Sequence, residues 1–542
     1  MSRPKPVYIF VFLVGVIAAM GGVAVTNGGF YIAKHEGDTL HLLQIVFRMA
    51  DGEWPHLDFM TPIGIMAFLP IVAFVKAGFG IGHSILWGQV VVALILLMPV
   101  FWVAYSRFNN ALAYFFGLTV MVLVLALVYG ETDRLVSISM HYNRWAWAVS
   151  YLVIVAAVLP GRVAQNGWID GVVIGLGMAF LLLSKITYFT AFMPGVLVAL
   201  VLRRAWQSLG AALVAGLVVM AVMTAFAGVG FWAAYLNDLI TVSSTDVRPN
   251  PGAPLKAVIG APAYLGGSLA CILAIVLLRQ AGQATLGLAL LVLMPGFFFV
   301  TYQNSGNDPQ WLPLLAILLL APQVDPEARN GLGWPLARAL AFTAVAALSL
   351  GAPSFLNLAY SPFRHATFDT ASYQPLVSGL VGHSDLQGRI VRSNRMDAIV
   401  ALDEPGSGLE YLQETANRKV TEVEFRGERL PQCELNLGLM AWFKATMAEL
   451  DGTGLTRGKR VYVADLFSSH WLFGDVKRLK GGAPWYYGGL PGFESAEFLM
   501  VPLCPAALEI RKLILEAVTE RGTELTEIHR GKLFVLYEIN QG

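Results

Sequence analysis

The sequence is poor in charge. Only 13% of its 542 residues are Asp, Glu, Lys or Arg, and the formal net charge is +1. A chain with so little excess positive charge carries no broad basic surface, so nucleic acid is not an expected partner. No zinc-finger or dinucleotide-binding fingerprint occurs either, which leaves these classes of function without support.

Cysteine is also scarce, with three residues in the whole chain. Cys271 lies in an apolar run, whereas Cys433 and Cys504 lie in the more polar C-terminal part. The latter two can form a disulfide if that part is outside the cytoplasm, or they can be two separate buried thiols. No metal-ligand spacing surrounds any of the three.

What the chain has in abundance is apolar sequence. Hydrophobic residues make up 56% of it, and the mean hydropathy is +0.61. The first apolar run, from Val7 to Val25, is longer than the core of a signal peptide, so we interpret it as an uncleaved span with Arg3 and Lys5 in the cytoplasm. Because a spanning helix needs about 20 residues, we expect eleven spans, at 7–26, 84–106, 110–129, 145–161, 168–184, 186–202, 207–228, 255–278, 283–301, 311–322 and 335–353.

Basic loop residues support an N-terminus in the cytoplasm. With that start, six arginines fall on the cytoplasmic side, as the positive-inside rule requires: Arg107, Arg162, Arg203, Arg204, Arg279 and Arg329. A span at 61–79, "TPIGIMAFLPIVAFVKAGF", would reverse them, so we interpret it as an interfacial or re-entrant helix on the outer side. Eleven spans then place the C-terminus outside.

The composition changes near residue 355. "GKRVYVADLF", "SAEFLMVPL", "GKLFVLYEIN" and "LQGRIVRSNRMDAIVAL" have the character of strands. "CELNLGLMAWFKATMAELDG" and "AALEIRKLILEAVTERG" have helical periodicity and end in glycine. We therefore predict a polytopic α-helical membrane domain at 1–354, followed by a soluble, extracytoplasmic α/β domain at 355–542.

Two acids lie in the first outer loop, in "YIAKHEGDTLHLLQIVFRMADG". In extended chain, Glu36 and Asp38 would point the same way, so they could act as a base, as ligands of a divalent metal, or as holders of a hydroxylated substrate. Asp38 has a structural alternative as N-cap of the amphipathic interfacial helix behind it. Glu36 has no such local explanation, which favours a functional role.

Two cations stand out because they lie next to apolar runs. Lys185, in "LLLSKITYF", either extends to the membrane interface or binds a phosphate. Arg144, in "HYNRW", either grips a phosphate with two donors or anchors the interface beside Trp145 and Trp147.

Further polar residues fall in outer loops and make a candidate substrate surface. Asn307 and Asp308, just before Pro309, can also form an ordinary turn that has no binding role. With the predicted topology these loops face the same side, which indicates a polar cavity that opens outward. The candidate substrate-binding residues are His35, His141, Tyr142, Asn143, Gln303, Asn304, Asn307 and Asp308.

This layout resembles the C-type glycosyltransferase superfamily (GT-C), whose members are multi-span enzymes that use polyprenyl-phosphate-linked sugars. The resemblance rests on "HEGD", on the interfacial helix after it, and on "DGEWPHLDFMTPIG", which is similar to a stretch of the aminoarabinose- and protein-mannosyltransferase branch. It covers roughly residues 1–355. "TPIG" lacks the paired prolines common in that branch.

The resemblance implies a glycosyltransferase of hexose or pentose in the bacterial inner membrane, with its C-terminal domain in the periplasm. It implies a polyprenyl-phosphate sugar donor, a lipid or cell-envelope glycan acceptor, and inverting displacement. Glu36 or Asp38 would be the base, and Lys185 and Arg144 would bind the donor phosphate. A divalent metal held by Glu36 and Asp38 and a metal-free site both stay open. The alternative is a transporter or flippase of a lipid-linked sugar, and the oligomeric state is not indicated.

Overall fold

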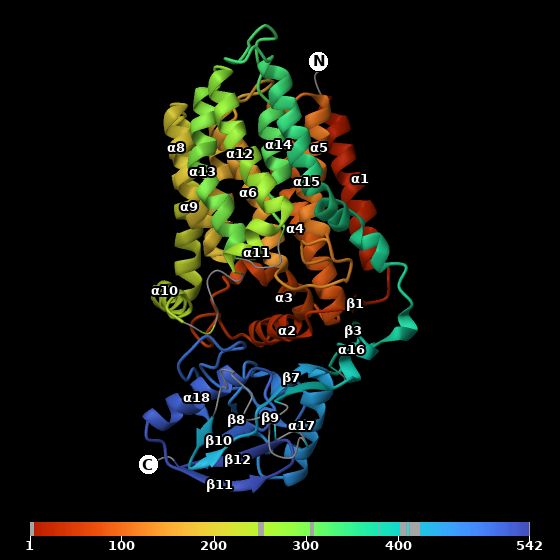
Figure 1. Cartoon of the computed structure of the whole chain (residues 1–542), viewed down its shortest axis with the longest axis vertical. Helices are drawn as coiled ribbons and strands as arrows, with labels where there is room; N and C mark the ends of the chain where they lie inside the picture. The colour runs from red at the N-terminus through yellow and green to blue at the C-terminus, as the bar shows by residue number, and fades with distance from the viewer. Residues whose placement is uncertain are drawn as a thin grey trace.

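The computed structural model describes residues 5–245, 247, 254–303, 308–377, 379–401, 408, 411 and 423–540. Helices fill the N-terminal part, and the strand-rich C-terminal part lies at one end of the helical bundle (Figure 1). The first described helix begins at the opposite end of the bundle, far from the C-terminal domain (Figure 1).

Each of the eleven segments that we predict as spans contains a helix. Seven of these helices are long and apolar enough to cross a membrane: α1 (Pro6–Val25), α4 (Ile81–Arg107), α7 (Gly167–Ser184), α9 (Trp206–Ala227), α12 (Pro262–Gln280), α13 (Ala284–Gln303) and α15 (Leu336–His365). The other four are shorter or less apolar: α5 (Asn110–Leu125), α6 (His141–Val158), α8 (Ile186–Leu202) and α14 (Leu312–Leu320). The coarser prediction, a helical chain with several candidate membrane spans, is therefore confirmed by seven such helices among the described residues, and the count of eleven stays a prediction.

Several short elements lie at the end of the bundle that faces the C-terminal domain. They are β1 (Phe30–Ile32), α2 (Glu36–Ala50), η1 (Ile65–Ala67), α3 (Leu69–Lys76), α10 (Gly230–Ser243) and α11 (Leu255–Gly260). α2 and α3 lie across the end of the bundle, between it and the C-terminal domain (Figure 1). With 8 residues, α3 rises only about 12 Å, so it is too short to cross a membrane, in agreement with the prediction for 61–79.

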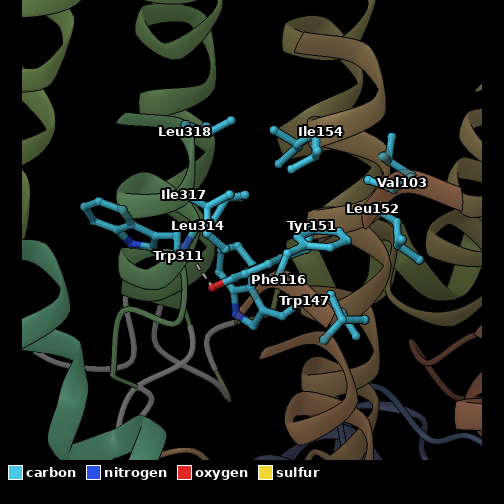
Figure 2. Close-up of a cluster of buried hydrophobic side chains, with 14 of the residues drawn as sticks. Val103, Phe116, Trp147, Tyr151, Leu152, Ile154, Trp311, Leu314, Ile317 and Leu318 are labelled. Carbon is cyan, nitrogen blue, oxygen red and sulfur yellow. Dashed lines mark hydrogen bonds between the residues drawn. The ribbon is translucent and has the colours of Figure 1, made fainter. Parts of the chain in front are cut away.

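Large side chains from α6 and α14 fill the centre of the bundle (Figure 2). Tyr151 of α6 is fully buried, and its hydroxyl donates to the Gln310 carbonyl at 2.6 Å and accepts from the Leu314 amide at 3.1 Å. A buried hydroxyl needs such partners, and this one ties α6 to the start of α14.

Arginines gather at the bundle end away from the C-terminal domain. Arg107 is fully buried and pairs with Asp170 at 2.7 Å, while Arg203 donates to the Ala157 carbonyl at 2.6 Å. Arg162 donates to the Ala321 carbonyl at 3.0 Å. Grouping of these arginines at one end is what the positive-inside rule needs, and the orientation itself stays a prediction.

The C-terminal domain is built on a five-stranded sheet in the order β11 (Leu525–Arg530), β12 (Phe534–Ile539), β10 (Phe498–Pro502), β8 (Lys459–Val463), β9 (Val476–Lys477). β8 and β10 are parallel, and β10 and β12 are antiparallel. The domain also contains α16 (Ile390–Asn394), α17 (Leu439–Thr453), α18 (Leu508–Glu520), η4 (Ser469–Leu472) and η5 (Phe493–Ser495).

Two antiparallel strand pairs accompany this sheet: β4 (Asp397–Val400) with β7 (Cys433–Leu437), and β5 (Glu424–Phe425) with β6 (Glu428–Arg429). Cys433 of β7 forms a disulfide with Cys504, which decides between the two alternatives that the sequence left open. A disulfide agrees with an oxidising compartment for this domain.

A small sheet joins the two halves of the chain. β3 (Leu386–Arg389) pairs in parallel with β1 and antiparallel with β2 (Tyr373–Pro375), which follows η2 (Thr370–Ser372). Because α15 continues to His365, the predicted domain boundary between 354 and 355 falls inside a helix. The segment that follows α15 pairs with β1 of the N-terminal half, so a shared β-sheet connects the two halves.

Candidate functional site

The acidic pair lies in the first turn of α2. The helix begins at Glu36, with His35 at the N-cap in the left-handed region (φ +60°), so the N-cap role that we considered for Asp38 is wrong. In a helix, side chains two residues apart point about 200° apart, whereas in extended chain they point the same way. The expectation that the two carboxylates share one side is therefore also wrong. The negative charges of both acids still stabilise the N-terminal end of α2, where the helix dipole is positive.

Glu36 is engaged by the C-terminal domain. Its two carboxylate oxygens accept from Arg392 of α16, from Nε at 2.7 Å and from Nη2 at 3.1 Å. Only 8% of Glu36 is exposed. The residue therefore has a structural partner after all, 356 positions away, which no local pattern in the sequence could indicate.

Asp38 points to a different neighbour. Its carboxylate accepts from the Ser139 hydroxyl at 2.7 Å, and it borders a cavity of about 10 Å³, which holds about one water molecule. The cavity is lined by Asp38, His41, His141 and Tyr142 together with Leu42, Ile63, Phe68, Ile138 and Met140. Of the two acids, Asp38 is thus the one that a small molecule in this cavity would meet.

Lys185 approaches the same region through Tyr142. It lies at the junction of α7 and α8, and its Nζ is 5.5 Å from the centre of the Tyr142 ring, a cation–π distance. The junction is held by Gly64, whose amide donates to the Ser184 carbonyl at 3.0 Å. A Cβ at Gly64 would lie 2.1 Å from the Leu183 carbonyl oxygen, so only glycine permits this approach.

Arg144 lies inside the bundle. It is 1% exposed, and its guanidinium donates to the Leu123 carbonyl at 3.2 Å and lies 3.4 Å from the Gln89 side-chain amide. The carbonyls near the end of α5 carry partial negative charge, which suits a cation. Trp145 and Trp147 are buried too, so the interfacial-anchor interpretation is wrong. The phosphate-binding role stays a prediction, and it would require a phosphate to enter the interior of the bundle.

Three other predicted substrate residues have structural contacts around the site. His141 Nε2 is 2.8 Å from the Ala67 carbonyl oxygen and Asn143 donates to the Met140 sulfur at 3.3 Å, so both brace the start of α6. His35 Nδ1 is 2.9 Å from the Ser137 hydroxyl. Burial lowers the pKa of His35, although Asp38 acts in the opposite direction.

The last predicted cluster is described only in part. Asn304 and Asn307 lie outside the described residues, and Gln303 is the final residue of α13. The Asp308 amide donates to the Gly130 carbonyl at 3.3 Å. Burial, with help from the nearby Glu131, raises the pKa of Asp308 to about 6. Asp308 therefore belongs with the loop after α5.

That loop carries charged residues that the sequence analysis did not single out. Lys34 forms ion pairs with Glu131 and with Asp133, the latter at 2.7 Å. Asn357 of α15 donates to the backbone carbonyls of Glu131 and Asp133, each at 2.7 Å. These contacts place a charged network beside α2. In the sequence, the only indication of this network was that two loops on the same predicted side both carry charged residues.

The residues do not fit the metal that the resemblance leaves open. Glu36 is held by Arg392 and points away from Asp38, so the pair does not present a common set of ligands. In the part of the chain that the structure describes, no group of three or more His, Cys, Asp or Glu side chains could hold a metal ion. We therefore derive no step through a metal.

Comparison with known proteins adds no family to this geometry. The chain matches no family model, no curated protein and no solved structure.

Proposed function

We propose that this protein is a membrane glycosyltransferase that moves a sugar from a polyprenyl-phosphate donor to a hydroxyl of a lipid or cell-envelope glycan at the outer face of the membrane. One observation carries the proposal: Asp38 and Tyr142 line one small cavity, of the size of a hydroxyl group or one water molecule, and the Lys185 ammonium lies over the Tyr142 ring. A proton acceptor and a cation near the same tyrosine are the groups that transfer from a phosphate leaving group requires.

In the proposed reaction, Asp38 takes the proton of the acceptor hydroxyl. The acceptor oxygen forms a bond to the anomeric carbon, and the bond from that carbon to the phosphate oxygen breaks with inversion. The electron pair stays on the phosphate oxygen, so the polyprenyl phosphate leaves with one more negative charge than the donor had. Lys185 balances that charge. Arg144 has no part in this scheme because its guanidinium is buried inside the bundle, against Leu123 and Gln89.

An apolar pocket in the helical bundle supports a lipid-linked substrate. It has a volume of about 360 Å³ and lies among α11, α12, α13 and α14, with Leu255, Leu265, Phe299 and Trp311 in its lining. A hydrocarbon chain suits such a lining.

The opposite end of the bundle favours transfer over transport. Arg107 and Asp170 are buried against one another there, and Arg107 also donates to the Ala156 carbonyl at 3.2 Å. These charges pair with one another and with backbone groups. A cavity of about 760 Å³ at this end, with Asn109, Arg162 and Gln323 in its lining, shares no lining residue with the cavity at Asp38. A flippase needs one polar route through the bundle, so these separate cavities give it less support than they give the transferase.

The test is donor consumption by purified protein in lipid nanodiscs, with polyprenyl-phosphate hexose and pentose as donor probes and a bacterial cell-envelope lipid extract as the source of acceptor hydroxyls. Asp38→Asn should slow the release of polyprenyl phosphate by at least about 100-fold, since it removes a general base. Lys185→Met keeps the apolar stem and should weaken binding of polyprenyl phosphate roughly 10-fold or more. Asp51→Asn, at the exposed end of the same α2, is the matched control and should behave as wild type.

Two results would contradict the proposal. A wild-type rate in Asp38→Asn would remove the base assignment. Movement of labelled donor across liposome membranes by the wild-type protein, without any release of polyprenyl phosphate, would establish the flippase instead.

A further inference from the structure

We infer that the C-terminal domain completes the site, and that Arg392 and Glu36 form a positioning pair that sets the first turn of α2 so that Asp38 faces the cavity. The inference rests on the proposed function for its catalytic meaning. It changes the role of Glu36 from a candidate base to a residue that acts through Asp38.

The small sheet that connects the two halves explains how the ion pair of Arg392 and Glu36 forms. β1 and β3 run in parallel, with Phe30 opposite Leu386 and Ile32 opposite Gly388. The chain leaves both strands in the same direction, so the residues that follow them stay close. Glu36 comes four residues after the end of β1, and Arg392 comes three residues after the end of β3. Their meeting is thus a consequence of strand register.

Gly37, between the two acids, is a second contact point of the C-terminal domain. A Cβ at this position would lie 2.5 Å from Cζ of the Phe467 ring, so the ring packs directly on the backbone of the first turn. Phe467 lies edge-on to Trp485 at 4.8 Å between ring centres, and Trp485 lies 5.7 Å from the ring of His41. Aromatic side chains of the C-terminal domain therefore cover α2 beside the cavity-lining His41.

Independent contacts hold the rest of α2. Gln44 is fully buried, donates to the Ser469 hydroxyl at 2.8 Å and accepts from Trp471 Nε1 at 3.0 Å. Arg48 donates to the Leu479 carbonyl at 3.1 Å. Because these bonds keep the domain docked, loss of the Arg392–Glu36 pair should loosen the first turn and leave the remaining interface in place.

The same interface offers a matched control. Arg478 of the C-terminal domain forms an ion pair with Asp51, at the other end of α2. Removal of this pair deletes an interdomain ion pair on the same helix without touching the first turn. A general effect of domain docking would appear on loss of either the Arg392–Glu36 pair or the Arg478–Asp51 pair. An effect on the position of Asp38 would appear only on loss of the Arg392–Glu36 pair.

The experiment compares Glu36→Gln, Arg392→Gln, Arg392→Lys and Arg478→Gln with the wild-type full chain in nanodiscs. We expect Glu36→Gln and Arg392→Gln to lower kcat for donor consumption at least 10-fold while KM for the donor stays within twofold. Arg392→Lys retains one charged donor and should recover part of the loss. Amide hydrogen exchange in residues 36–40 should become faster in the first two variants, and Arg478→Gln should match wild type in both measurements.

The kinetic and hydrogen-exchange measurements test the proposed function and the positioning role separately. Unchanged exchange in residues 36–40 of Arg392→Gln would overturn the inference, whatever the enzyme does. An equal kcat loss in Arg478→Gln would also overturn it, because the effect would then come from docking in general. A wild-type protein that consumes no donor would overturn the proposed function, even if the exchange result holds.

Discussion

Acid should weaken the C-terminal domain through His470. This residue lies in η4 and is 3% exposed, and its ring meets the Phe443 ring edge-on at 4.6 Å. Neither ring nitrogen has a hydrogen-bond partner among the described residues. Burial lowers the pKa of His470 from 6.5 to about 3, because a charged imidazolium without partners is poorly accommodated in an apolar environment. The folded domain therefore holds this histidine neutral.

The sign and the size of the effect follow from proton linkage. Between pH 6.5 and about 3 the unfolded chain binds a proton on His470 that the folded chain does not, so stability falls as the pH falls. The full contribution is present above pH 6.5. At about pH 4.5, two units below 6.5, the loss is about 2.7 kcal/mol, from about 1.36 kcal/mol per unit. The loss of stability at pH 4.5 depends only on the pKa of His470 in the unfolded chain, provided that its pKa in the folded chain lies well below 4.5.

The measurement is urea unfolding of the full chain, followed by tryptophan fluorescence at pH 7.5 and at pH 4.5, for wild type and His470→Leu. Wild type should lose about 2.7 kcal/mol more than the variant between the two pH values. Other titrating groups, including His35, are common to both proteins and cancel in the difference. At pH 7.5 the variant should be at least as stable as wild type, because two unpaired buried nitrogens are gone.

One result would refute this reasoning. If wild type and His470→Leu lose the same free energy of unfolding between pH 7.5 and pH 4.5, then His470 can bind a proton in the folded state. It would then have to be solvated or paired with an acid, and its position beside Phe443 in a sealed interior would be wrong.

Three further predictions test the fold. Reduction of the disulfide between Cys433 and Cys504, which are 71 positions apart, should destabilise the C-terminal domain by about 4 kcal/mol on loop-closure grounds, measured as a lower unfolding midpoint in dithiothreitol. Tyr151→Phe leaves the two backbone groups that it bridges without a partner and should cost about 1–3 kcal/mol in thermal unfolding. Gly37→Ala should speed exchange in the first turn of α2, and a second change, Phe467→Leu, should reverse that effect by removing the clashing ring.

Local signals accounted for most of the secondary structure. Hydropathy and helical periodicity depend on residues close in sequence, and all eleven predicted span segments contain helices. The predicted strands in "GKRVYVADLF", "SAEFLMVPL" and "GKLFVLYEIN" correspond to β8, β10 and β12. "LQGRIVRSNRMDAIVAL" instead divides into β3, α16 and β4, because its first part pairs with β1 and its last part pairs with β7. Both partners are remote in the chain.

The start of α2 was mispredicted for a related reason. A good N-cap contributes about 1 kcal/mol, which favours a helix that begins after Asp38. A hydrogen bond to a charged group contributes about 1.5–3 kcal/mol, and a start at Glu36 accompanies two such bonds from Arg392 and one from Ser139. The long-range bonds therefore outweigh the local preference. Neither Arg392 nor Ser139 can be identified as a partner from sequence spacing.

The four residues "HEGD" show why an acidic motif does not assign its own chemistry. His35 turns the chain into the helix, Glu36 binds Arg392, Gly37 admits the Phe467 ring, and Asp38 meets Ser139 and the cavity. Two of these four positions serve the C-terminal domain and one serves the helical bundle. A chain without the C-terminal domain would keep the partner of Asp38 and lose those of Glu36 and Gly37. Under the proposed function, the acid that acts in the reaction is therefore Asp38, whose partner Ser139 belongs to the N-terminal half of the chain.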